Sequence, residues 1–208
     1  MELTNHFDFT YLYNTYNAIK PIKLMVLDTE TTRSGEVIQV AYNIYLYYPE
    51  IKHYICLSKH DWIINEKINK VDFYGKYTLR DIRIKGKDPH YVFSVLSVHL
   101  EDVVYLIGHN IKFDIDKIVK YFTKLDISYK LPIPVCTMRL SKDRLGLINV
   151  KGWIKFPKLS ELYTWYYGEE PDQTKTHTAD YDIHLTFLCF KAIHSDNLIS
   201  IKNHRICV

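Results

Sequence analysis

The sequence lacks several features that would assign a protein to a class at once. Its 208 residues include four cysteines, which lie far apart and form no Cys-x-x-Cys pair. A zinc knuckle and a disulfide framework are therefore not indicated, and free thiols in a reducing compartment, the cytoplasm, are expected. No stretch reaches the roughly 18 apolar residues of a membrane span, and the N-terminal residues lack the basic start and apolar core of a signal peptide. A membrane partner is not expected.

Neither charge nor repetition points to a particular partner. The net charge of +3 is too small to indicate a nucleic-acid ligand, unless the positive side chains are concentrated locally. Because no internal repeat, low-complexity tract or linker is present, we expect one domain over residues 1–208, with a core of about residues 22–195 and short extensions at both ends. Alanine is scarce, and Lys, Ile, Asn and Tyr are abundant. Their codons suggest an AT-rich genome, such as that of many viruses, in which case the host cytoplasm would be the place of action.

The stretch at residues 23–30, Lys-Leu-Met-Val-Leu-Asp-Thr-Glu, is the most informative in the chain. Four consecutive apolar residues suit a strand that is buried on both faces. Asp28 and Glu30 follow two residues apart, so in an extended backbone they project to the same side. Carboxylates at the end of a buried strand must be paired, hydrogen-bonded or bound to a metal. A single Asp-x-Glu is weak evidence, because most such pairs are solvated strand ends.

The remaining chain predicts an α/β protein with an antiparallel meander that continues into parallel strands. After the first strand, residues 37–48 and 52–58 alternate apolar and polar residues as further strands of the meander. Residues 61–71 suggest a short helix capped by Asp61, residues 78–87 a loop or irregular helix, and Asp88-Pro89 a helix start. Later segments predict a strand at 103–107, a helix from Ile111, a strand or short helix after Pro132, a helix at 159–166, a mobile stretch at 169–176 and a long last helix from Thr178.

Three short pieces place acids at strand ends or in the first turns of helices. They are residues 28–30, 108–114 and 177–182, and they contribute four carboxylates. Such carboxylates would repel one another at one place unless cations lay between them. Oxygen ligands without sulfur select hard ions such as Mg²⁺ or Mn²⁺, and two ions about 3.5–4 Å apart serve in-line attack on a phosphodiester. We therefore expect two divalent metal ions as cofactors.

In order and spacing these pieces resemble the three motifs of the DEDD superfamily, the DnaQ-like 3′→5′ exonucleases. His177 precedes Asp182 by five positions, as in the histidine branch (DEDDh), whereas the tyrosine branch would need Tyr in place of Thr178. The resemblance spans about residues 24–193. It implies a ribonuclease-H-like mixed sheet with helices on both sides, and release of nucleoside 5′-monophosphates from the 3′ end of DNA or RNA.

The resemblance also implies roles for individual residues. Asp28, Glu30 and Asp182 would bind the metal that activates water, Asp28 would bridge to the second metal, and Asp114 would hold that ion directly or through water. His177 would be the general base. Contacts to the terminal nucleotide and the strand end would come from the backbone around Thr29 to Thr31 and from His109, Asn110 and Phe113. For the last two, a helix cap and a core position are the structural alternatives.

The sequence departs from the family pattern at three places. Arg33 stands where a glycine usually follows the first motif, Cys136-Thr137 replaces a common Asp-Thr, and Ile183 replaces a common alanine. None of these changes removes a metal ligand, but the first remodels the turn beside the terminal-nucleotide pocket.

A candidate surface for gripping the strand lies at residues 151–158, where lysines alternate with aromatic residues. Trp153 could stack on a base and Lys155 could contact a phosphate, which would suit single-stranded nucleic acid with a free 3′ end. Packing of these aromatics onto the domain edge is the alternative. The basic stretch from Arg80 to Lys87 is a comparable candidate, for which a solvated loop is the simpler interpretation.

Two other functions fit parts of the pattern. A nucleic-acid-binding protein with reduced catalysis would not need all five of Asp28, Glu30, Asp114, His177 and Asp182. A ribonuclease-H-like endonuclease also collects acids, but it does not require a histidine five residues before the last one. Proofreading would need a polymerase or another protein as partner, and the sequence does not indicate the oligomeric state.

Overall fold

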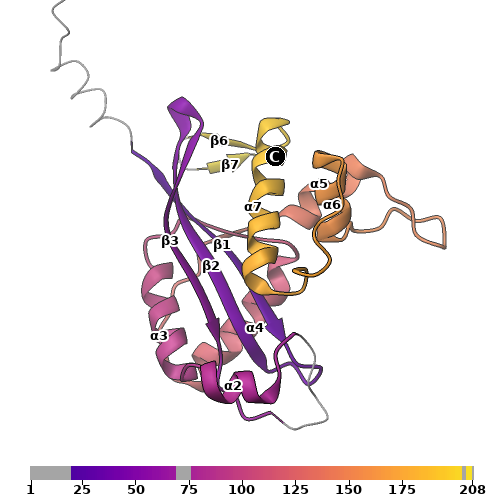
Figure 1. Cartoon of the computed structure of the whole chain (residues 1–208). Helices are drawn as coiled ribbons and strands as arrows, with labels where there is room; N and C mark the ends of the chain where they lie inside the picture. Colours follow the sequence, from indigo (N-terminus) through magenta and orange to yellow (C-terminus); the bar gives the residue numbers. More distant parts are fainter. Residues whose placement is uncertain (1–19, 69–75, 203–204, 208) are drawn as a thin grey trace, which may run out of the picture.

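A five-stranded mixed sheet forms the centre of the molecule (Figure 1). The computed structural model describes residues 20–68, 76–202 and 205–207. The strand order is β3-β2-β1-β4-β5; the first three strands pair antiparallel, and β4 and β5 run parallel to β1. The predicted meander with parallel strands is confirmed. The strands are β1 (Ile22–Thr31), β2 (Val37–Tyr48), β3 (His53–Ile63), β4 (Tyr105–Gly108) and β5 (Ile133–Cys136).

Helices cover both faces of this sheet, as predicted. One face packs against α3 (Pro89–Leu100) and α4 (Ile111–Lys124), and the other against α5 (Thr137–Leu145), α6 (Leu159–Tyr167) and α7 (Ala179–Ser195). The remaining elements are the short helices η1 (Pro49–Ile51) and α2 (Leu79–Lys85) and a hairpin of β6 (Ser200–Lys202) and β7 (Arg205–Cys207). None of the helices within the described residues is long and apolar enough to span a bilayer.

The two-sided burial of β1 fixes where its terminal acids point. Leu24 and Val26 belong to the core under α7, whereas Met25 and Leu27 belong to the core under α3 and α4. Side chains alternate along a strand. Asp28 and Glu30 therefore continue on the α7 side, and Thr29 points toward α4.

Several predicted elements differ in the structure. Asp61 does not cap a helix; it lies in β3 opposite Ala41, and the helix predicted from there is wrong as far as residue 68, while residues 69–71 lie outside the described part. The cause is β2, whose 12 residues offer backbone hydrogen bonds along the full length of β3. The basic stretch near Arg80 forms the regular helix α2, started by a Thr78–Asp81 capping box.

Candidate active site

The candidate active site lies where the end of β1 meets the first turns of α4 and α7. Because β4 is parallel to β1, with Ile107 opposite Val26, the chain enters α4 beside the acids of β1. Gly108 makes this approach possible: a Cβ atom there would lie 2.6 Å from Ile111 Cδ1 and 3.1 Å from the carbonyl oxygen of Leu27. The structure thus brings together elements that are far apart in the sequence.

Asp114 is held against β1 by two hydrogen bonds. Its Oδ1 atom accepts from the backbone nitrogen of Thr29 at 2.9 Å and from the Thr29 hydroxyl at 2.7 Å. Asp114 is buried, with 3% of its surface exposed, and these bonds give its buried carboxylate the hydrogen-bond partners that a buried polar group needs. Both end on one oxygen, which leaves Oδ2 as the oxygen that can serve a cation. The side chain of Thr29 is occupied by this contact.

Glu30, His177 and Asp182 form the second half of the site. One ligand atom from each lies within 4.8 Å of the other two. Glu30 and Asp182 are half-buried and His177 is exposed, on a turn where its φ is +62°. Its backbone N–H donates to the carboxylate of Asp182. The imidazole therefore lies beside the acids at the open side of the site.

The electrostatics of the acids fit a cation site. Burial, followed by repulsion from Asp114, Asp182 and Glu30, raises the pKa of Asp28 well above its usual range. Burial is also the first cause at the other acids: it raises the pKa of Glu30 and Asp114 to about 7 and that of Asp182 to about 6. Ionising all four is therefore unfavourable without nearby positive charge. Four carboxylates with no sulfur ligand form the donor set that Mg²⁺ and Mn²⁺ prefer.

A cavity of about 330 Å³ opens beside His177 and Asp182. Gln173 and Thr176, from the turn before α7, form one part of its lining. Lys158, Leu159 and Ser160, at the start of α6, form another. A small polar ligand can therefore reach His177 and Asp182 from this side.

The other predicted substrate residues lie around the site in different environments. Thr31 is half-buried at the end of β1, Asn110 is exposed at the N-cap of α4 with φ at +68°, and Phe113 is 42% exposed with Lys117 Nζ 5.0 Å above its ring. Among the described residues, Asn110 makes no side-chain capping bond, and the exposure of Phe113 argues against a core position. Their contact with substrate stays a prediction.

His109 joins the site to its surroundings. Its Nδ1 lies 3.0 Å from the hydroxyl of Thr137, and its Nε2 lies 3.0 Å from the carbonyl oxygen of Pro157. Burial lowers its pKa to about 4, so the ring is neutral at physiological pH and Nε2 donates to Pro157. The contact with the strand end predicted for His109 stays a prediction, and the observed contacts tie the start of α5 to the loop before α6.

The loop at residues 147–157 projects from the body of the molecule (Figure 1). Trp153 lies on it with 71% of its surface exposed, so it does not pack onto the domain edge. Lys155 is paired with Glu161, with 2.5 Å between Nζ and Oε1. It is Lys158, three residues further on, that lines the cavity. Contact of Trp153 and Lys155 with nucleic acid stays a prediction.

Gln39 supports the site and was missed by the sequence analysis. Its side chain is fully buried; its carbonyl accepts from the backbone nitrogen of Ala179 at 2.9 Å, and its amide donates to Asp61 at 2.6 Å. The first N–H of α7 is thus bound from β2, 140 residues away, instead of by the side chain of Thr178. A glutamine in a strand gives no sequence signal of such a role.

The sheet order and the helices on both faces define a ribonuclease-H-like α/β fold. No protein-family model matches the chain, and no curated protein matches it in sequence. Solved structures with this fold do match: E. coli exonuclease I in complex with a dT13 oligonucleotide has a TM-score of 0.63 at 16% identity, over 84% of this chain and 41% of that one. The chain thus spans less than half of exonuclease I.

Two further structures have the same fold. A full-length 3′-exonuclease has a TM-score of 0.58 at 12% identity, over 95% of this chain and 74% of that one. Cell-death related nuclease 4 (CRN-4) has a TM-score of 0.56 at 17% identity, over 84% of this chain and 64% of that one. The fold implied by the DEDDh resemblance is therefore confirmed.

Proposed function

We propose that this protein is a metal-dependent 3′→5′ exonuclease that releases nucleoside 5′-monophosphates. The convergence of four carboxylates with raised pKa values and one exposed histidine carries this proposal. The solved structures with the same fold are those of nucleases, which agrees with the proposal. A binding protein would have no need to keep buried carboxylates that repel one another.

The four carboxylates would hold two divalent ions. Asp28, Glu30 and Asp182 would bind the first, and Asp28 with Asp114 Oδ2 the second. Bound Mg²⁺ or Mn²⁺ ions lower the pKa of water and stabilise the charge that develops on a phosphodiester. The hydrogen bonds from Thr29 to Asp114 would fix the ligand oxygen of that acid before any metal arrives.

His177 would take the proton from the attacking water. Its position beside Glu30 and Asp182, on the exposed side, supports a base that reaches the water without entering the buried donor set. A ligand role would instead weaken metal binding when the histidine is replaced. The first-motif turn and α4 would hold the 3′-terminal nucleotide through Thr31, Asn110 and Phe113.

Single-stranded nucleic acid is the proposed substrate. The oligonucleotide in the exonuclease I complex is a thirteen-nucleotide dT strand, and the exposed Trp153 suits stacking on unpaired bases. Lys158 lines the cavity, so a strand that enters the cavity would contact this lysine.

The direction of cleavage tests the proposal against an endonuclease. Matched DNA and RNA strands, single and duplex, carry a 5′ label and end in either a 3′-hydroxyl or a 3′-phosphate. With Mg²⁺ or Mn²⁺ we expect a descending ladder from the 3′-hydroxyl strand and resistance of the 3′-phosphate strand, because a dianion there would meet Glu30. Internal fragments that form at equal rates from the 3′-hydroxyl strand and the 3′-phosphate strand would contradict the proposal. Two variants form a matched pair. Asp114→Asn alters a proposed metal ligand, and Asp116→Asn is its control, because Asp116 lies exposed on the same helix and is paired with Lys112.

A further inference from the structure

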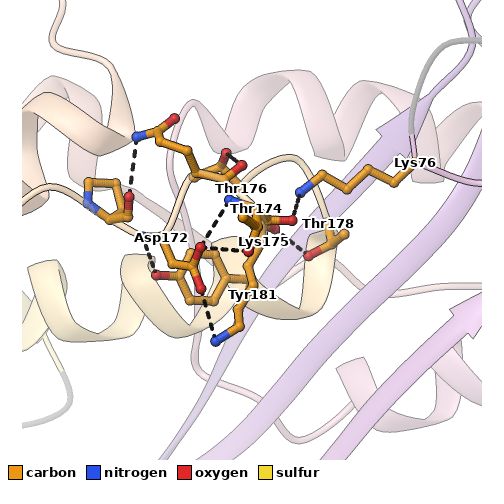
Figure 2. A network of polar contacts seen from close by, with 9 residues as sticks. Lys76, Asp172, Thr174, Lys175, Thr176, Thr178 and Tyr181 are labelled. Carbon is orange, nitrogen blue, oxygen red and sulfur yellow. Dashed lines mark hydrogen bonds and ion pairs between the residues drawn. The ribbon is translucent and has the colours of Figure 1, made fainter.

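His177 lies on a turn whose backbone is hydrogen-bonded at nearly every residue. The sequence predicted a polar, mobile stretch at residues 169–176, and in the structure residues 171–176 take part in a network of hydrogen bonds (Figure 2). A residue other than glycine with φ at +62° is held by its surroundings, because the left-handed region is unfavourable for it. The position of the imidazole therefore depends on the turn that precedes it.

Asp172 is the centre of this network. Its Oδ1 accepts from the backbone nitrogen of Thr174 at 2.9 Å and from the Thr174 hydroxyl at 2.6 Å, and its Oδ2 lies 3.1 Å from Lys175 Nζ. Its carbonyl oxygen accepts from the backbone nitrogens of Lys175 and Thr176 at 2.9 and 3.2 Å. Asp172 thus contacts three of the four residues that follow it, namely Thr174, Lys175 and Thr176 (Figure 2).

The turn is tied to the rest of the molecule on two sides. Toward α7, the backbone nitrogen of Asp172 donates to the hydroxyl of Tyr181 at 3.0 Å, and the Thr178 hydroxyl donates to the carbonyl of Lys175 at 2.7 Å. Toward α2, Lys76 Nζ donates to the carbonyl of Thr174 at 2.5 Å (Figure 2). The turn is therefore fixed both to the helix that carries Asp182 and to the segment before α2.

We infer that Asp172 is a positioning residue that sets the place of the His177 imidazole relative to the acids. This inference rests on the proposed function, since it needs His177 to act in the reaction. The carboxylate of Asp172 bonds to Thr174 and Lys175 within the turn, so its proposed effect on the reaction passes through the turn that leads to His177. Misplacement of a reacting group by about 1 Å can lower a rate about 100-fold.

A double-mutant cycle tests this inference directly. The rates of the wild type, Asp172→Ala, His177→Ala and the double variant are compared in the full-length protein, with single-stranded DNA and saturating Mn²⁺. We expect Asp172→Ala to lower kcat about 10- to 100-fold and His177→Ala to lower it about 10²- to 10⁴-fold. In the His177→Ala background, Asp172→Ala should lower kcat much less, because the route through the imidazole is already absent.

Conservative and control variants separate positioning from folding. Asp172→Asn keeps an oxygen that accepts from Thr174 and should retain most of the rate, although it loses the ion pair with Lys175. Glu170→Ala removes a neighbouring exposed acid and should leave the rate unchanged. Equal rate losses from Asp172→Ala in both backgrounds, or full activity of Asp172→Ala, would overturn the inference and leave the proposed function in place. Full activity of His177→Ala would instead contradict the general base of the proposed function.

Discussion

At the scale of single residues, the four acids make opposite demands on folding and on catalysis. Their raised pKa values mean that the folded protein without metal binds more protons than the unfolded chain between about pH 4 and pH 7. These groups therefore lower the stability of the metal-free protein as pH rises through this window. The same excess of negative charge is what would draw divalent cations to the site.

Replacement of Glu30 by glutamine should remove its share of this loss of stability in the metal-free protein. Glu30→Gln is neutral at every pH, so its melting temperature without metal should rise relative to the wild type as pH increases from 5 to 8, through the pKa of about 7 of Glu30. The difference between the two proteins cancels the contributions of buried histidines, which change in the opposite direction. Thermal denaturation in chelator at several pH values measures it. A constant difference across the window would contradict the assigned pKa.

How far these residues could be predicted depends on where their partners lie in the sequence. Asp28 and Glu30 could be predicted from the local sequence, because two acids follow at the end of an apolar run. Gln39 could not, since it acts through Asp61 and Ala179, which only the folded chain brings close. The carboxylate of Asp172 bonds to its sequence neighbours Thr174 and Lys175, but the sequence analysis did not identify the turn that they form before His177. For Lys155 and Lys158 the sequence offered no basis for choice, because an irregular loop has no period that says which side chain faces the cavity.

At the scale of elements, α7 is the helix whose placement matters most, because it carries Asp182 and begins beside His177. The sequence predicted its extent from its apolar stripe and its start from Thr178. It did not predict that β2 would bind its first N–H, nor that pairing with β2 would extend β3 through Asp61. Contacts with β2 determine both features, and local sequence propensity does not predict such long-range contacts.

The role of Gln39 gives a prediction for this helix. Gln39→Leu leaves the backbone N–H of Ala179 buried without its partner and should lower the free energy of unfolding by about 1–3 kcal/mol. It should also reduce activity, because the start of α7 is no longer fixed. Urea denaturation measures the first effect. Unchanged stability would mean that water or Thr178 replaces the glutamine.

At the scale of the whole molecule, helices on both faces of the sheet contribute acids to the candidate active site. The α7 side presents Asp28, Glu30 and Asp182 with the cavity, whereas α4 on the opposite face supplies Asp114 around the end of β1. The loop that carries Trp153 projects from the body of the molecule beside α5 and α6 (Figure 1). Its contact with the strand stays a prediction.

The exposed tryptophan gives a prediction for strand binding. Trp153→Ala should weaken binding of single-stranded DNA by about 1–3 kcal/mol, the range for one lost stacking partner, and should leave the melting temperature unchanged. Trp165→Ala removes an exposed tryptophan from α6 and serves as the control. Fluorescence anisotropy in the inactive Asp28→Ala background measures both. Equal affinity of the two variants would place the strand elsewhere.

The most direct test of the metal-dependent centre is the rate of nucleoside 5′-monophosphate release by Asp28→Ala, with Asp116→Ala as the matched control. We predict that Asp28→Ala abolishes release in Mg²⁺ and in Mn²⁺ while the metal-free protein stays folded, because loss of one acid relieves repulsion in the cluster. Asp116→Ala, which loses only an exposed ion pair with Lys112, should cleave at the wild-type rate. Release by Asp28→Ala at the wild-type rate would contradict the account.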